Sequence, residues 1–162
     1  MSSRNASRLQ CLAVCCAASS LAPALAADAA RMAIEWDLRL RSEHVDDAGF
    51  ARHADASTLR LRTGLRLSLG DGWTGVVEAE GIAASGAYNS GANGRSTLPQ
   101  VIDPPGVELN QAWLGWKGAR GGAAVGRQRL LFDNQRWIGS SGWRQNEQTF
   151  DALALDVAPR KD

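Results

Sequence analysis

The sequence predicts an all-β protein, an antiparallel meander of about six strands that forms part of a transmembrane β-barrel. Three observations lead to this prediction. Apolar and charged residues alternate strictly in two segments, the connections alternate between long and short, and no continuous apolar run of about 18 residues follows the N-terminal region. Alternation with a period of two residues is the pattern of β-strands, and the missing apolar run argues against a transmembrane helix.

The first two strands, Ile34–Arg41 and Leu59–Leu69, each have one apolar face and one charged face. The second strand exceeds the usual length of about 5–6 residues and reaches the roughly 9–11 residues with which a tilted strand crosses a bilayer. A soluble sandwich would alternate in the same way, with its apolar face in the core. In a barrel the apolar face contacts lipid through Leu38, Leu40, Leu59, Leu61, Leu65, Leu67 and Leu69.

Four further strands and their connections complete the predicted meander. The strands are expected at Trp73–Ala83, Val107–Trp116, Gly122–Leu130 and Glu147–Val157. Two connections are short, glycine-containing turns, Gly70–Gly72 and Lys117–Gly121. The other three are long, Asp46–Asp55, Ala84–Gly106 and Leu131–Asn146. Transmembrane barrels sort their connections in this way, with short periplasmic turns and longer outer loops.

The phase of the alternation is ambiguous in the second half of the chain. In the strand Val107–Trp116, Leu109 falls on the face opposite Leu114, so either a β-bulge changes the register or both faces are partly buried. In the next strand, Arg127 and Arg129 share a face with apolar residues. A bulge, or the emergence of this strand from the membrane, would resolve that conflict.

Residues 1–26 are expected to form a secretory signal peptide that ends in the small-residue cleavage site Ala24–Ala26. All three cysteines lie in this segment, so the mature chain, residues 27–162, is expected to lack thiols and disulfides. Acidic and basic residues are nearly balanced, which argues against a nucleic-acid partner. The sequence contains no phosphate-binding loop or dinucleotide fingerprint, and we expect no cofactor.

A fairly specific pattern runs from the fourth strand onward, in the segments Glu108–Trp116, Val125–Arg129, Asp133–Arg136 and Gly142–Asp151. In this pattern the chain resembles the alginate export family of outer-membrane porins, and the resemblance covers roughly the mature chain. It implies a β-barrel whose polar lumen passes solutes. A member that resembles an alginate exporter would conduct an anionic polysaccharide.

The length of the chain differs from that of this family, whose barrels are several times longer. Six strands fall below the about eight of the smallest single-chain barrels. The last residues, Arg160–Asp162, lack the terminal strand ending in an aromatic residue that the outer-membrane assembly machinery usually reads. We therefore expect the chain to represent the N-terminal portion of a barrel.

These inferences together predict a porin-like channel in the bacterial outer membrane for the passive passage of solutes or of an anionic polysaccharide such as alginate. Outer-membrane lipid and the assembly machinery are the other expected partners. No enzymatic activity is expected. The alternative is a soluble periplasmic β-sandwich or small barrel that binds a glycan and has the leucine face as its core.

The pore-lining residues are expected on the charged strand faces, where fixed arginine charge would lower the barrier for anions. They are Arg39, Arg41, Arg60, Arg62, Arg66, Glu78, Glu80, Arg127 and Arg129. The alternative is that the arginines pair with acidic residues on neighbouring strands and only keep this face hydrated. Glu78 and Glu80 share a strand face as a glycosidase pair could, but nothing indicates a pocket, so no catalytic residue is expected.

The connection before the last strand is expected to fold into the channel as a constriction. Its aromatic, amide and charged groups suit sugar rings and hydroxyls, and the residues are Asp133, Asn134, Arg136, Trp137, Trp143 and Arg144. The alternative places the tryptophans in an interfacial belt at the outer rim.

His44 and His53 flank the first long loop, which also contains Asp46, Asp47 and Asp55. This composition would suit a metal ion, but the spacing matches no standard ligand pattern. We therefore expect solvated loop residues here and no metal site.

Overall fold

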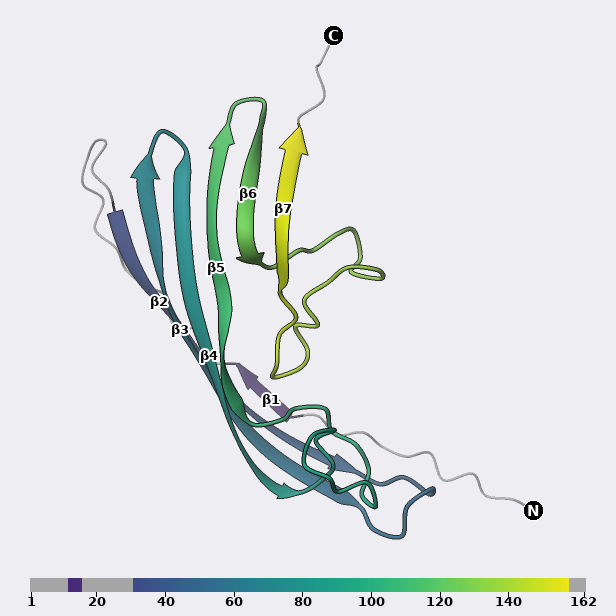
Figure 1. Cartoon of the computed structure of the whole chain (residues 1–162). Coiled ribbons are helices and arrows are strands. Elements are labelled where there is room, and N and C mark those ends of the chain that lie inside the picture. The colour runs from purple at the N-terminus through teal and green to yellow at the C-terminus, as the bar shows by residue number, and fades with distance from the viewer. Residues whose placement is uncertain (1–11, 16–30, 158–162) are drawn as a thin grey trace.

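The computed structural model describes residues 12–15 and 31–157, which form seven β-strands arranged in one antiparallel sheet (Figure 1). The strands pair in chain order, so the predicted all-β meander is confirmed. Among these residues, no helix is long and apolar enough to cross a membrane. The strands are β1 (Leu12–Cys15), β2 (Arg31–Val45), β3 (Ala54–Gly70), β4 (Trp73–Ala87), β5 (Gly106–Gly118), β6 (Gly121–Gln128) and β7 (Phe150–Val157).

Strands β2–β7 correspond to the six predicted strands, but two of their boundaries differ from the prediction. The pairing of β2 with β3 continues to Val45↔Ala54, so His44 and Asp55 belong to strands and not to the loop. Strand β7 begins at Phe150, so Glu147 lies in the preceding connection and not in a strand. Local alternation could not place these ends, because tertiary contacts decide where pairing stops.

Strand β1 lies within the segment expected to be a signal peptide. It pairs with β2 from Leu12↔Ser42 to Cys15↔Arg39. The predicted cleavage site at Ala24–Ala26 lies outside the described residues, so the signal peptide stays a prediction.

From β2 to β7, the meander places the two short turns at one end of the sheet and the three long connections at the other (Figure 1). At the short end, Gly70, Asp71 and Gly72 join β3 to β4 with positive φ angles of 85°, 48° and 82°. Gly72 is required for a second reason, because a Cβ atom there would lie 2.2 Å from the carbonyl oxygen of Lys117. The predicted asymmetry of the connections is therefore present in the fold.

Burial in this sheet is the reverse of that in a soluble sandwich. On β3, Arg60 and Arg62 are only 5% and 9% exposed, whereas Leu61 between them is 47% exposed. The soluble alternative requires the opposite arrangement, with the leucine face as the core. The exposed apolar face of β2 and β3 comprises Met32, Ile34, Trp36, Leu38, Leu40, Leu59, Leu61, Leu65 and Leu69.

A β-bulge resolves the ambiguous phase of β5. Glu78 on β4 pairs with Gln111, but the next residue, Ala79, pairs with Leu109. Asn110 is therefore the extra residue, and Leu109 joins the exposed face that also carries Leu114. Of the two possibilities that the sequence left open, the bulge is confirmed.

Candidate functional site

The candidate site is the polar face of the sheet, and cross-strand register builds its first layer. Arg62 stands opposite Asp37 on one side and Glu80 on the other, and its guanidinium bonds the Glu80 carboxylate. Arg60, which the register places opposite Arg39, forms a diagonal ion pair with Asp37. Nearer the short-turn end, Arg66 Nε lies 2.7 Å from Glu35 Oε1. Opposite charges therefore alternate across β2, β3 and β4.

The bulge at Asn110 brings an amide into this charged layer. Asn110 Nδ2 donates to Glu78 Oε1 at 2.8 Å, and Gln111 Nε2 donates to the same oxygen at 3.1 Å. Asn110 is 1% exposed and Glu78 is 8% exposed. The extra residue of the bulge thus hydrogen-bonds a carboxylate that is withdrawn from solvent.

Glu147 enters the layer from the connection between β6 and β7, residues 129–149. Its carboxylate pairs with Arg129, lies 3.2 Å from Arg62 Nη2 and accepts a hydrogen bond of 3.0 Å from Asn110 Nδ2. Arg129 also donates to Glu78 Oε1 at 2.7 Å. Glu147 therefore links the strand wall to the connection that crosses it.

Gln145 is the most deeply buried polar residue of this connection, with no measurable exposure. Its side-chain amide donates to Thr58 Oγ1 at 2.8 Å and to the Thr58 carbonyl at 3.2 Å. Its backbone N–H donates to Asp103 Oδ1 at 2.8 Å. The connection is thus hydrogen-bonded to β3 and to the segment between β4 and β5.

The guanidinium of Arg39 binds backbone carbonyls of the same connection. Nη1 donates to the carbonyl oxygens of Gly142 at 2.9 Å and Arg144 at 3.1 Å, and Nη2 donates to that of Trp143 at 3.0 Å. These acceptors are neutral carbonyl groups, so these three contacts do not compensate the positive charge of Arg39. The turn at residues 142–144 is fixed to β2 as a result.

The connection between β4 and β5 covers the polar face at the long-loop end. Tyr88 and Val101 pack with Ala54 and Ala56 in a small apolar cluster. Burial raises the pKa of Tyr88, which keeps its phenol protonated, and the hydroxyl donates to the carbonyl of Asp103 at 3.1 Å. Asp103 is 1% exposed, and its carboxylate accepts a hydrogen bond of 2.6 Å from Arg41 Nη1.

Most arginines of the polar face are paired with acidic residues, which is the arrangement given above as the alternative to a positively charged pore wall. Arg41, Arg60, Arg62, Arg66 and Arg129 each contact a carboxylate, so the face is balanced in charge and not uniformly positive. Such a face is polar, and carboxylates compensate the charge of these arginines. The pore-lining role of these residues stays a prediction.

Arg127 does not lie with the other predicted pore-lining residues, and this placement corrects the expectation. The register pairs Arg127 with Ala112, on the face that also carries Leu114 and Val125. Its guanidinium bonds Asp151 on β7 with distances of 2.9 and 2.7 Å. Arg129 reaches the polar face because β6 has ended one residue earlier, at Gln128.

The predicted constriction residues divide into two groups. Arg144 and Trp143 belong to the turn held by Arg39, and the Arg144 guanidinium lies 4.6 Å from the centre of the Trp143 ring. Asp133 lies in the exposed part of the connection, and Trp137 there is 89% exposed. Four of the six residues, Asn134, Arg136, Trp137 and Trp143, line one open pocket together.

Sequence reasoning assigned no role to the residues that fix this arrangement, which are Thr58, Asp103, Asn110, Gln145 and Glu147. Their signal is weak, because a polar residue in a loop or at a strand end is ordinarily solvated. Only the approach of distant segments, such as Gln145 to Thr58, buries them.

Replacing Gln145 by alanine is expected to loosen the turn at residues 142–147. The change removes the amide that bonds Thr58 and leaves buried groups unpaired, which costs about 1–3 kcal/mol. Trypsin should therefore cut after Arg144 faster than in the unchanged protein. Gln148→Ala is the matched control, because Gln148 is exposed, and cleavage after the exposed Arg136 serves as an internal reference. Equal cleavage after Arg144 in both variants would contradict this role.

An antiparallel meander with an exposed apolar face and a buried polar face has the architecture of a transmembrane β-barrel wall. The family model for alginate export matches residues 29–162, and the chain belongs to this family. The alginate export family is a family of outer-membrane transport proteins. No curated protein and no solved structure matches the chain.

Proposed function

We propose that this protein forms part of the wall of an outer-membrane channel, through which an anionic polysaccharide such as alginate, or smaller solutes, pass passively. Transport in this proposal needs no cofactor and no catalytic residue. The partners are outer-membrane lipid on the apolar face, the polysaccharide on the polar face, and the assembly machinery that inserts outer-membrane barrels.

The reversed burial of the sheet carries the proposal. An apolar face with residues such as Leu40, 58% exposed, has no favourable place in water. The opposite face holds charged residues such as Glu80, 1% exposed, in an ion-paired network. Lipid on one side and a hydrated lumen on the other satisfy both faces at once.

A channel also requires a closed wall, because hydrocarbon does not tolerate unpaired strand edges. Among the described residues, β7 forms one edge of the sheet and β1 the other. The proposal therefore includes further strands that close the barrel, supplied by a longer chain or by further copies of this one.

The turn held by Arg39 is the proposed constriction. It crosses the polar face, and the adjoining pocket carries Trp137 and Trp143 with Asn134 and Arg136. Tryptophan rings suit the apolar faces of sugars, while the amide and guanidinium groups suit hydroxyls and carboxylates. Arg39, bonded to three carbonyls, adds positive charge beside this pocket.

The test is ion conductance across planar lipid bilayers that contain the purified protein. We expect discrete conductance steps that alginate oligosaccharides interrupt and neutral glucose oligosaccharides of the same length interrupt more weakly. Trp143→Ala should weaken the interruption roughly tenfold, which corresponds to about 1.4 kcal/mol. Trp73→Ala is the matched control, since Trp73 lies at the short-turn end of the sheet.

Two results would contradict the proposal. Bilayers that show no conductance, although the protein is folded in them, would exclude a channel formed by copies of this chain. Equal interruption by charged and neutral oligosaccharides would exclude recognition of an anionic polymer and leave only a general pore.

A further inference from the structure

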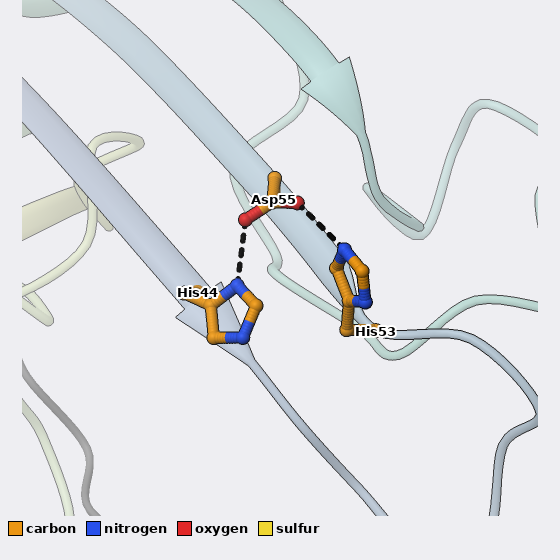
Figure 2. A group of neighbouring side chains, drawn as sticks. All are labelled: His44, His53 and Asp55. Carbon is orange, nitrogen blue, oxygen red and sulfur yellow. Dashed lines mark hydrogen bonds and ion pairs between the residues drawn. The ribbon is translucent and has the colours of Figure 1, made fainter.

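We propose that His44, His53 and Asp55 form a zinc-binding site at the long-loop end of the β2–β3 hairpin. The three residues come together on the surface of the sheet (Figure 2). Two imidazoles and one carboxylate, with the remaining positions filled by water, make a ligand set that suits Zn²⁺.

Strand register brings two of the ligands together. His44 on β2 pairs directly with Asp55 on β3, and His44 Nδ1 lies 2.6 Å from Asp55 Oδ1. This cross-strand pair exists because the hairpin continues beyond the predicted loop boundary. The sequence spacing of the three residues is unusual for a metal site because a hairpin, and not a helix or a local turn, provides the geometry.

His53 completes the group from the residue just before β3. Its Nε2 atom lies 3.1 Å from Asp55 Oδ2, and the two imidazole rings have centres 5.0 Å apart. The three ligand atoms all lie within 4.8 Å of one another. Ligands of one tetrahedral zinc ion are about 3.3 Å apart, given metal–ligand distances of about 2.0–2.2 Å. Small side-chain rotations therefore suffice to bind the ion.

The position of the group keeps it accessible. The three side chains are 57–60% exposed. They lie beyond the apolar band, because the pair Leu40↔Leu59 is followed by Ser42↔Ser57 and then by His44↔Asp55. The site thus lies above the lipid-facing leucines, at the end of the sheet that carries the long connections, where metal ions in solution can reach it.

A zinc ion at this site would link the last cross-strand pair of β2 and β3 to the loop between them. The hairpin end is otherwise held by backbone pairing up to Val45↔Ala54 and by the small apolar cluster beneath it. Since the ion binds only when the hairpin is formed, zinc stabilises the folded protein by mass action. The proposal does not depend on transport by the protein.

The experiment is a zinc titration of the full chain in detergent, in competition with a chromophoric zinc indicator. The protein carries no histidine tag, and its thiols are alkylated so that Cys11, Cys15 and Cys16 cannot contribute. We expect one zinc ion per chain. The whole sequence contains only two histidines, so zinc should shift both sets of imidazole proton resonances and no others.

Ligand variants and a matched control decide the assignment. Loss of outer-shell partners alone weakens metal sites about 10–100-fold, so His53→Ala should weaken zinc binding at least about tenfold. Asp55→Asn should also weaken it, whereas Asp46→Asn makes the same charge change in the same hairpin and should leave it unchanged. Heat-modifiable mobility on gels verifies that each variant is folded.

Three results would overturn the site. These are the absence of stoichiometric zinc binding, equal affinity of unchanged protein and the folded His53→Ala variant, and equal weakening by Asp46→Asn and Asp55→Asn. The first would mean that Asp55 only accepts hydrogen bonds from the histidines.

Discussion

Glu80→Ala is expected to lower the free energy of unfolding by about 3–5 kcal/mol, the loss that follows when one partner of a buried ion pair is removed. Glu80 is 1% exposed and bonds the guanidinium of Arg62, which is itself 9% exposed. Without this carboxylate, the ion pair left to Arg62 among the described residues is the contact of 3.2 Å with Glu147. The remaining positive charge would be withdrawn from water and under-compensated.

Equilibrium unfolding by denaturant, in detergent or lipid vesicles, measures this loss. Glu108→Ala is the matched control, because Glu108 pairs with Glu80 in the β4–β5 register but is exposed. The control should change stability by no more than about 1 kcal/mol. If the two variants lose the same amount, the Arg62–Glu80 pair is hydrated in the protein and does not hold the polar layer together.

Leu61→Arg is expected to destabilise the membrane-inserted protein by about 2–4 kcal/mol, the cost of an arginine near the bilayer midplane on a lipid-facing position. Leu61 lies on the exposed face of β3, between the Leu59 and Leu65 positions of the same apolar band. The substitution places a charge in hydrocarbon, where no hydrogen-bonding solvent compensates it. Neighbouring residues of the polar face are unaffected, since they point away from it.

A depth-matched control separates lipid exposure from general disruption of the strand. Ser57→Arg places the same side chain on the same face of β3, beyond the apolar band and next to Ser42. Near the membrane interface the cost falls to about 0–1 kcal/mol. Unfolding from lipid vesicles measures both variants. Similar losses at the two positions would show that the leucine face does not contact lipid.

The two experiments examine the opposite faces of the sheet, since Glu80 lies on the polar face of β4 and Leu61 on the apolar face of β3. Arg62 and Leu61 are adjacent in sequence, but one is buried against a connection and the other is exposed. A soluble sandwich would be sensitive to charge on the leucine face at every depth, because that face would be its core. A barrel wall is sensitive only within the hydrocarbon, so the depth dependence is the decisive result.

Much of the fold could be predicted from local patterns. The strict alternation in β2 and β3 reports two different environments on the two sides of a strand, and it needs no knowledge of the rest of the protein. Turns such as Gly70–Gly72 require positive φ, which glycine adopts at little cost. The phase of β5 was open, because a bulge at Asn110 inserts one residue without any strong sequence signal.

The candidate site was only partly predictable. The charged residues of β2, β3 and β4 were found because they alternate with apolar residues. Arg127 lies on the face of Val125, as their shared phase indicates, and not in the polar layer that was predicted for it. Gln145 and Glu147 received no role, because their partners lie on strands far away in the sequence.

The amino-acid sequence by itself determined the strand periodicity, the two-faced character of the sheet and the alternation of long and short connections, because these depend on neighbours within a few residues. Only the tertiary structure decided which charges neutralise one another and which segment crosses the polar face. It also brought His44, His53 and Asp55 together. The physical reason is that hydrogen bonds and ion pairs act over a few ångströms, and only strand register and chain reversal bring such distant residues within that range.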